Sequence, residues 1–175
     1  LEFEGDGWQW QFGGRVHADS AWFDEDVTPF EDEADFRRAR VKSRLTVDHD
    51  WRLSAEYDFG GTNTGWKNTY LQYRGWKRWR VTAGNHIAPL GLAELGSSND
   101  DPFMEQPLAS ALNPGLLTGV SANTWGRGWT AAGGVFGDEL SNESQRKSEG
   151  EGGVLRFTAA PSRGQGTLLH VGIAG

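Results

Sequence analysis

Alternate residues in the segment 36–47, FRRARVKSRLTV, have opposite chemical character. Successive side chains of a β-strand point to opposite faces, so four basic side chains share one face of this segment: Arg38, Arg40, Lys42 and Arg44. The other face carries small and apolar side chains from Ala39 to Val47. Like charges at this spacing repel unless water, counterions or facing acids screen them. The segment predicts a strand with one wet, basic face and one buried face, a pattern that ordinary soluble sheets also produce.

Eight further segments alternate in the same way, so the sequence predicts an all-β protein with about nine antiparallel strands. The expected strands cover residues 8–23, 36–47, 51–59, 66–73, 79–84, 116–124, 129–136, 154–159 and 167–174. In the first of them, aromatic side chains lie at both ends of the apolar face. This distribution is typical of a strand that crosses a bilayer between interfacial aromatic girdles, although a Trp-rich strand of a soluble sandwich shows it too.

The composition excludes several classes of protein. The absence of Cys rules out disulfide scaffolds, thiol catalysis and Cys-based zinc sites. A net charge of −7 argues against nucleic-acid binding. No apolar run reaches about 18 residues, so we expect no transmembrane helix, whereas barrel strands would escape such a search. Because the chain starts at Leu1 without an apolar signal core, we expect a processed protein or an excised piece.

The connections between the expected strands are long and short in turn. The longest, residues 85–115, is rich in Gly, Pro, Asn and Asp and has no sustained period, and such a length predicts a functional loop. In an antiparallel sheet this order places every long connection at one end. Outer-membrane barrels have short periplasmic turns and long outer loops, so the pattern predicts an antiparallel transmembrane β-barrel.

Stretches throughout the chain are similar to those of one known family: FGGRVHADSAWFDED (12–26), DFRRAR (35–40), DWRLSAEYDF (50–59), NTYLQYRGW (68–76), VTAGNHIAPLGLAELGSS (81–98), FMEQPLA (103–109), NPG (113–115) and GVFGD (134–138). The chain resembles the phosphate-selective porin O and P family. This resemblance implies a sixteen-stranded trimeric barrel of roughly twice this length, in which the third outer loop folds into the lumen. Residues 1–175 would then be the N-terminal part of a single porin β-barrel domain, with a constriction loop at about 85–115.

The resemblance also implies roles for individual residues. Arg15, Arg37 and Arg38 match positions in the basic lining of the pore, and Ser97 and Ser98 match a serine pair on the constriction loop. The same loop departs from the family where phosphate-specific members have basic residues: the chain has Glu94, Asn99 and Gln106. Further acids lie close by: Asp100, Asp101 and Glu105. Phosphate specificity is therefore doubtful, whereas barrel and pore are retained.

Alternation places the basic side chains of several strands on polar faces. The predicted pore-lining anion track consists of Arg15, Arg38, Arg40, Lys42, Arg44, Arg52, Arg80 and Arg156. Such a track attracts anions and lowers their entry barrier. Three acids on polar faces, Asp19, Glu56 and Asp58, could instead pair with it. The lumen is then either anion-favouring or mixed and weakly selective.

No residue pattern indicates an enzyme or a cofactor. The four histidines lie on different elements without zinc-ligand spacing: His17, His49, His86 and His170. The acidic segment 24–35 could hold a divalent cation that bridges lipopolysaccharide, but it also fits a solvated loop. Nucleophile elbows and phosphate-binding glycine motifs are absent. We expect no catalytic residue, no metal site and no cofactor.

The sequence thus predicts a channel-forming porin in the outer membrane of a Gram-negative bacterium, allowing passive diffusion of small anionic or neutral hydrophilic solutes. Its expected partners are outer-membrane lipid, lipopolysaccharide and two further copies in a homotrimer. The alternative is a secreted soluble β-sandwich that uses Trp side chains to bind carbohydrate. Trp residues in bands at strand ends facing lipid would support the barrel, and Trp residues lining one groove would support the binding module.

Overall fold

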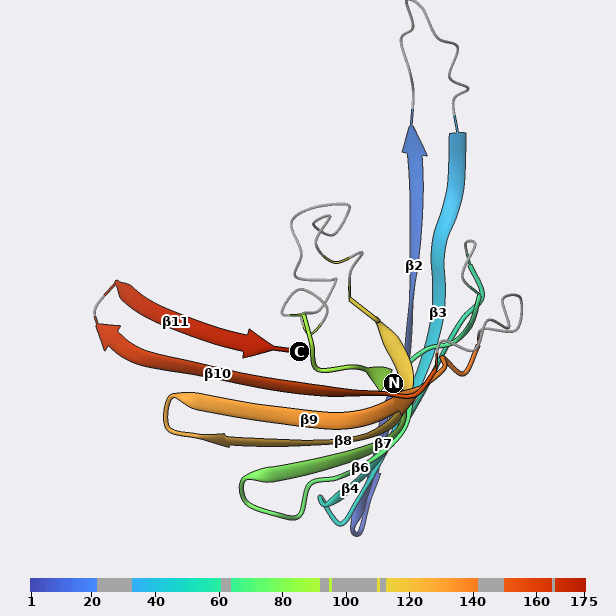
Figure 1. The fold of residues 1–175 in the computed structure, drawn as a ribbon. Helices are drawn as coiled ribbons and strands as arrows, with labels where there is room; N and C mark the ends of the chain where they lie inside the picture. Colours follow the sequence, from blue (N-terminus) through green and yellow to red (C-terminus); the bar gives the residue numbers. More distant parts are fainter. Residues whose placement is uncertain are drawn as a thin grey trace, which may run out of the picture.

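The computed structural model describes residues 1–21, 33–60, 64–91, 95, 110, 113–141, 150–164 and 166–175. These residues form one antiparallel sheet (Figure 1). Its strands are β1 (Glu2–Gly5), β2 (Trp8–Ala21), β3 (Glu33–Val47), β4 (Trp51–Asp58), β5 (Gly65–Trp66), β6 (Thr69–Tyr73), β7 (Trp79–Ile87), β8 (Leu116–Gly126), β9 (Trp129–Gly137), β10 (Gly152–Gly164) and β11 (Thr167–Ala174). Among the described residues, no helix is long and apolar enough to cross a membrane.

Chain order and spatial order coincide. The strand order is β1-β2-β3-β4-β6-β7-β8-β9-β10-β11, and the short β5 pairs with β4. Figure 1 shows the sheet curving from β2 and β3, upright in the view, to β10 and β11, which run across it. The two end strands, β1 and β11, pair with only one neighbour each. The described residues therefore form an open, curved up-and-down sheet, which is consistent with the predicted antiparallel β-barrel but does not close into one.

All nine expected segments correspond to strands, and the structure contains two more. The strand β1 is only 4 residues long, too short to show a period. The expected strand 66–73 is divided into β5 and β6. The strand β7 continues past its expected end at Gly84 and reaches Ile87. Gly84 has φ of 125°, a backbone conformation that glycine alone adopts readily, and the strand passes through it.

The register confirms that the basic residues of β3 share one face. Arg40 lies opposite Arg15 of β2 and Asp58 of β4. Two residues along, Lys42 lies opposite Glu56. A β-bulge between His17 and Asp19 of β2 shifts the pairing, so that β3 continues to Glu33 with Asp35 opposite Asp19. Part of the expected acidic loop 24–35 is therefore strand.

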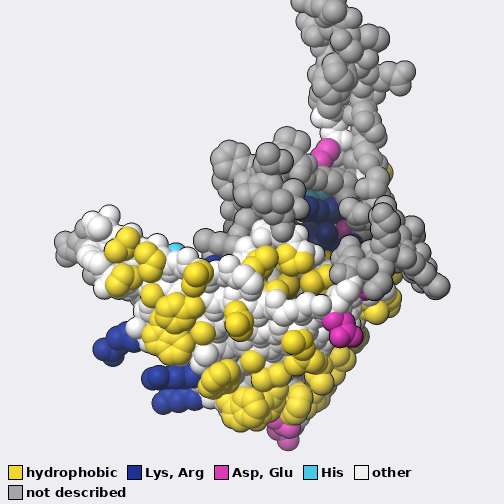
Figure 2. Space-filling view, in the orientation of Figure 1, with side chains coloured by type: hydrophobic (Ala, Val, Ile, Leu, Met, Phe, Trp, Pro, Cys, Tyr) yellow, Lys and Arg dark blue, Asp and Glu magenta, His cyan; other side chains and the backbone are white. Residues whose placement is uncertain are grey.

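The two faces of the sheet have the polarity opposite to that of a soluble protein. Ala88, Pro89 and Phe136 are the only buried apolar side chains among the described residues, whereas most buried side chains are polar, such as Ser54, Glu56 and Asp58. Large apolar side chains are exposed, for example Val135 at 67% and Leu155 at 74%. Figure 2 shows these side chains gathered on the convex side of the sheet. Covering each one with an apolar medium is worth about 1.5–3 kcal/mol, so this face requires such a medium.

Aromatic side chains on the apolar face form bands at both ends of the strands. Near the short turns the band includes Trp8, Trp51, Tyr73, Trp76 and Trp79. Near the long connections Tyr57 contacts Phe59 and Trp66, with ring centroids 4.6 and 5.3 Å apart. Two aromatic bands that flank an apolar zone are typical of strands that cross a bilayer. The described Trp residues on this face therefore lie in two bands and do not line one carbohydrate-binding groove.

Candidate channel lining

The polar face is built from alternate positions of adjacent strands. One continuous row across the sheet consists of Thr46, Arg52, Gln72, Thr82 and Ser121, each opposite the next in the strand register. Three of these side chains are buried: Thr46, Thr82 and Ser121. Polar residues recur here because every second residue of each strand faces the same side. We call this surface the polar face.

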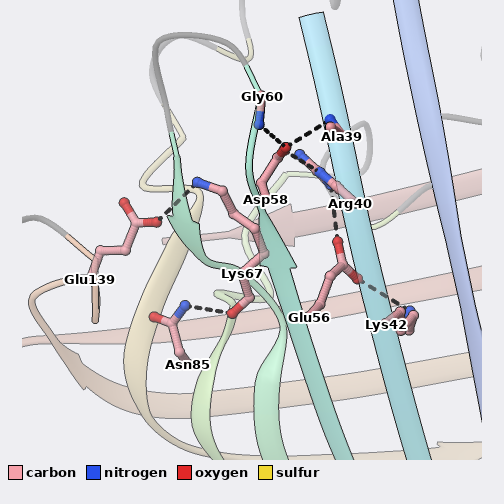
Figure 3. A network of polar contacts seen from close by, with 9 residues as sticks. All are labelled: Ala39, Arg40, Lys42, Glu56, Asp58, Gly60, Lys67, Asn85 and Glu139. Atoms are coloured by element: carbon pink, nitrogen blue, oxygen red, sulfur yellow. Dashed lines mark hydrogen bonds and ion pairs between the residues drawn. The ribbon is translucent and has the colours of Figure 1, made fainter. Parts of the chain in front are cut away.

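An ion-pair network joins β3 and β4 on the polar face (Figure 3). Arg40 contacts both acids, with Nε 2.5 Å from Asp58 Oδ2 and Nη1 3.1 Å from Glu56 Oε1. Lys42 Nζ lies 3.4 Å from the other oxygen of Glu56. Asp58 Oδ1 also accepts hydrogen bonds from the backbone N–H groups of Ala39 and Gly60. Two of the predicted track cations are therefore paired with two buried carboxylates, so the four charges of this network sum to about zero on this part of the polar face.

The cations nearer the short turns have different surroundings. No described carboxylate lies within salt-bridge distance of four arginines: Arg44, Arg52, Arg74 and Arg80. The charges of the other three are close enough to Arg52 to act on it. The Nε groups of Arg44, Arg52 and Arg74 are buried without a hydrogen-bond partner, as is the hydroxyl of Ser54. We call Arg44, Arg52, Arg74 and Arg80 the unpaired cluster.

Aromatic and amide groups hold two members of the unpaired cluster. The guanidinium of Arg80 lies over the ring of Trp125, 4.8 Å from the ring centroid, within the range of a cation–π contact. Arg44 Nη1 donates to Gln11 Oε1 at 3.4 Å. Neither partner neutralises a positive charge. Arg74 was missed in the sequence analysis because it follows the end of β6, although its backbone N–H continues the ladder to Asp50 O at 2.7 Å.

The remaining predicted track residues do not form one row. Arg15 and Arg38 are half-buried beside the ion-pair network, and Arg15 feels the charges of Arg38, Arg40, Glu56 and Asp58. Arg156 on β10 makes a different contact, because its Nη1 donates to Leu90 O at 3.0 Å. The structure thus gives Arg156 a contact with the segment that follows β7, which the strand pattern did not predict.

Most of the predicted constriction loop lies outside the described residues. This applies to all six residues assigned to it: Glu94, Ser97, Ser98, Asp100, Asp101 and Gln106. The same is true of the acidic residues from Asp24 to Asp32, and the side chain of Arg37 is not described either. Within the described ranges, no group of His, Asp and Glu could hold a metal ion.

Asn85 of β7 joins the strand β8 and two connections, one before β6 and one after β9. It is 1% exposed, and its Nδ2 donates to Lys67 O at 2.7 Å. Its Oδ1 accepts from Thr118 Oγ1 at 3.3 Å and from Leu140 N–H at 3.2 Å. Figure 3 shows Lys67 reaching toward Glu139, with Nζ 3.7 Å from Oε1. Sequence reasoning placed Asn85 in a loop and missed this role, because its partners lie far apart along the chain.

His86 is a packed structural residue. Its Nε2 lies 2.7 Å from Ser121 Oγ, and its ring packs 5.2 Å from that of Phe136. The histidine is buried between β7, β8 and β9.

Comparisons with known proteins identify the family. A search of curated proteins finds no match to this chain. The sequence profile of the family described as Phosphate-selective porin O and P matches residues 11–175, nearly the whole chain. The match spans every strand that forms the polar and apolar faces except β1 and the start of β2. With an all-β antiparallel sheet whose apolar face is exposed and whose polar face is lined with charge, the chain belongs to the phosphate-selective porin O and P family of outer-membrane porins.

Proposed function

We propose that this porin chain forms part of the wall of an anion-favouring channel for passive diffusion of small hydrophilic solutes. The observation that supports the preference is the imbalance of charge on the polar face. Glu56 and Asp58 are engaged by Arg40 and Lys42. The unpaired cluster then leaves positive charge that no described carboxylate offsets. In a water-filled lumen such groups attract anions while each contact stays weak enough for release.

The proposal does not include phosphate specificity. Where the family resemblance would require basic groups on the constriction loop, the chain has Glu94, Asn99 and Gln106. Without basic residues at these positions, the loop has no cations there that would strip water from phosphate and hold it. We therefore assign small anionic or neutral solutes in general as the permeant class, with the unpaired cluster rather than the third loop as the source of anion preference.

The proposed channel is a closed barrel in the outer membrane of a Gram-negative bacterium. Unpaired backbone groups at a strand edge cost several kcal/mol each in lipid, and β1 and β11 each leave one edge unpaired. Further strands would satisfy these edges, so we place residues 1–175 in the N-terminal part of one sixteen-stranded domain. The barrel length, the homotrimer and the contact with lipopolysaccharide rest on the family resemblance.

The zero-current potential of the full-length protein in a planar bilayer tests the proposal. Under a potassium chloride gradient, we expect a zero-current potential whose sign shows that chloride permeates more readily than potassium. A potential on the potassium side would contradict an anion preference and assign selectivity to the acidic third loop. A complete lack of conductance would overturn the channel itself.

The double variant Arg52→Gln, Arg80→Gln tests the assigned residues. A unit charge about 8 Å from a permeating ion contributes about 0.5 kcal/mol in water, so each lost cation should lower the chloride-to-potassium permeability ratio about twofold or more. Arg78→Gln is the matched control, because Arg78 is exposed in the turn between β6 and β7. An unchanged ratio in the double variant would place the unpaired cluster outside the conduction path.

A further inference from the structure

A hollow of about 350 Å³ lies beside the unpaired cluster on the polar face. Residues of β6, β7, β8 and β9 line it, and among those used below are Gln72, Arg80, Thr82, Asn123, Trp125 and Thr130. Its space comes from small residues on β9, since Ala132 lies opposite Asn123 and Gly134 lies opposite Ser121. A volume near the lower end of the ~300–1,000 Å³ range of ligand sites suits a solute of a few carbon atoms.

The hollow is lined by the cation of Arg80, by several neutral donors and acceptors, and by apolar side chains such as Ile87, Pro89 and Leu95. The guanidinium of Arg80 is oriented by the Trp125 ring. Gln72 is held in place because its Nε2 donates to Thr82 Oγ1 at 3.0 Å. The hydroxyl of Thr130 meets that of Thr158 at 2.6 Å. No described Asp or Glu lines the hollow. A ligand that fits this set has one negative charge and several hydroxyl groups.

Donors without a protein partner lie beside the hollow. Ser54 is 0% exposed, and its hydroxyl has no hydrogen-bond partner. The buried Nε groups of Arg44, Arg52 and Arg74 likewise have none. Arg52 lies directly opposite Gln72 in the strand register, so this donor-rich cluster borders the hollow. Buried donors in native proteins are normally satisfied by protein groups or water, so these enclosed atoms make the cluster rich in donors without contacting the solute themselves.

We propose that the hollow is a transient binding site for small hydroxylated carboxylates, the chemical class of the sugar acids. The carboxylate contacts Arg80 and the neighbouring Arg52, and the hydroxylated chain lies along Gln72, Thr82 and Asn123. A planar carboxylate matches the paired N–H donors of a guanidinium. This proposal rests on the proposed channel function and adds a preferred solute class to it. Binding remains weak enough for release because the hollow opens into the polar face.

Block of the chloride current in the full-length protein tests the site. Potassium gluconate should reduce the single-channel current in a saturable manner at constant potassium chloride. Acetate supplies the charge without the hydroxyl groups, and glucose supplies hydroxyl groups without the charge, so neither should reproduce the block. A gluconate effect that equals that of acetate, or that rises without saturation, would overturn the proposal.

Variants locate the block. Arg80→Gln should raise the half-blocking gluconate concentration at least about tenfold, because a charge-assisted hydrogen bond is lost. Asn123→Ala should weaken gluconate block, because it removes a hydrogen-bonding group that the hydroxylated chain contacts. Arg78→Gln, in the exposed turn, is the control and should leave the block intact. Equal half-blocking concentrations in all three variants would contradict the assignment.

Calorimetric titration of the detergent-solubilised full-length protein gives a readout independent of conduction. Gluconate should bind with a stoichiometry of one per chain, and Arg80→Gln should abolish the heat. If the protein conducts ions but binds no gluconate, the binding site fails and the channel stands. If it binds gluconate without any conductance, the site stands and the proposed channel function fails.

Discussion

Single residues on the polar face separate into paired and unpaired charges. Arg40, Glu56 and Asp58 satisfy one another at 2.5 and 3.1 Å, and the two acids expose only 7% and 3% of their side chains. Burying an ion pair carries a desolvation penalty that offsets much of the attraction between the charges, but the pairing orders the side chains. The main consequence here is a rigid, nearly neutral patch. The sequence pattern is clearest for the basic strand, but two of its cations, Arg40 and Lys42, are paired with carboxylates in the structure.

Glu56→Gln should convert part of this patch into positive surface. Lys42 would lose its carboxylate partner and Arg40 would keep only Asp58. We expect a zero-current potential that indicates a stronger preference for chloride, and a loss of about 1.5–3 kcal/mol in unfolding free energy, the value of a hydrogen bond to a charged group. Bilayer recordings and urea unfolding of the full-length protein measure the two effects. Glu151→Gln, exposed before β10, is the control, and equal potentials for both variants would contradict the assigned role of Glu56.

Strands are the scale at which the two environments are separated. In β8, Ser121 is buried on the polar face and its neighbour Val120 is 49% exposed on the apolar face. The same alternation occurs in β4, where Leu53 is 50% exposed and Ser54 is fully buried. A shift of one residue in register would move every polar side chain to the apolar face, so the apolar medium on one side specifies the pairing.

Val120→Arg should be strongly destabilising for this reason. The residue lies near the middle of β8 on the apolar face, and an arginine at the bilayer midplane costs about 2–4 kcal/mol. Val47→Arg on the same face, next to the aromatic band at Trp8 and Trp51, should cost only about 0–1 kcal/mol. Urea unfolding of the full-length protein in lipid vesicles compares the two. Equal losses would show that the apolar face does not contact lipid in the way proposed.

The whole molecule is a curved sheet whose strands follow one another in chain order. Neighbouring strands are adjacent in sequence, so every connection is local, and the long and short connections lie at opposite ends. At the long-loop end Asn85 ties β7 to Lys67 and Leu140. Arg156 ties β10 to Leu90. The contact of Arg156 holds the start of the connection between β7 and β8 against the sheet.

Barrel closure is the property that the whole molecule must satisfy. Because β1 and β11 each have an unpaired edge, residues 1–175 alone should not form a stable monomer in lipid vesicles. Cold gel electrophoresis should show no compact, heat-modifiable band for this segment, whereas the full-length protein should show one. Discrete, reproducible conductance from the isolated segment as a monomer would contradict the need for further strands.

Periodicity by itself determined the strands and their faces. The alternation in 36–47 and 51–59 predicted the sides of Arg40 and Glu56 correctly, because side-chain direction in a strand depends only on residue parity. Short or interrupted elements were less predictable. The strand β1 has too few residues for a period, and the continuation of β7 through Gly84 depends on a backbone conformation that composition does not reveal.

Tertiary structure decided which charges are free and which residues position the loops. Whether Arg40 pairs with Asp58 depends on the register between β3 and β4, and the sequence left both possibilities open. The unpaired Arg74, the cation–π contact of Arg80 and the hollow beside them need four strands in register. Local sequence specifies the direction of a side chain, whereas its partner comes from another strand, and only the folded sheet brings the two together.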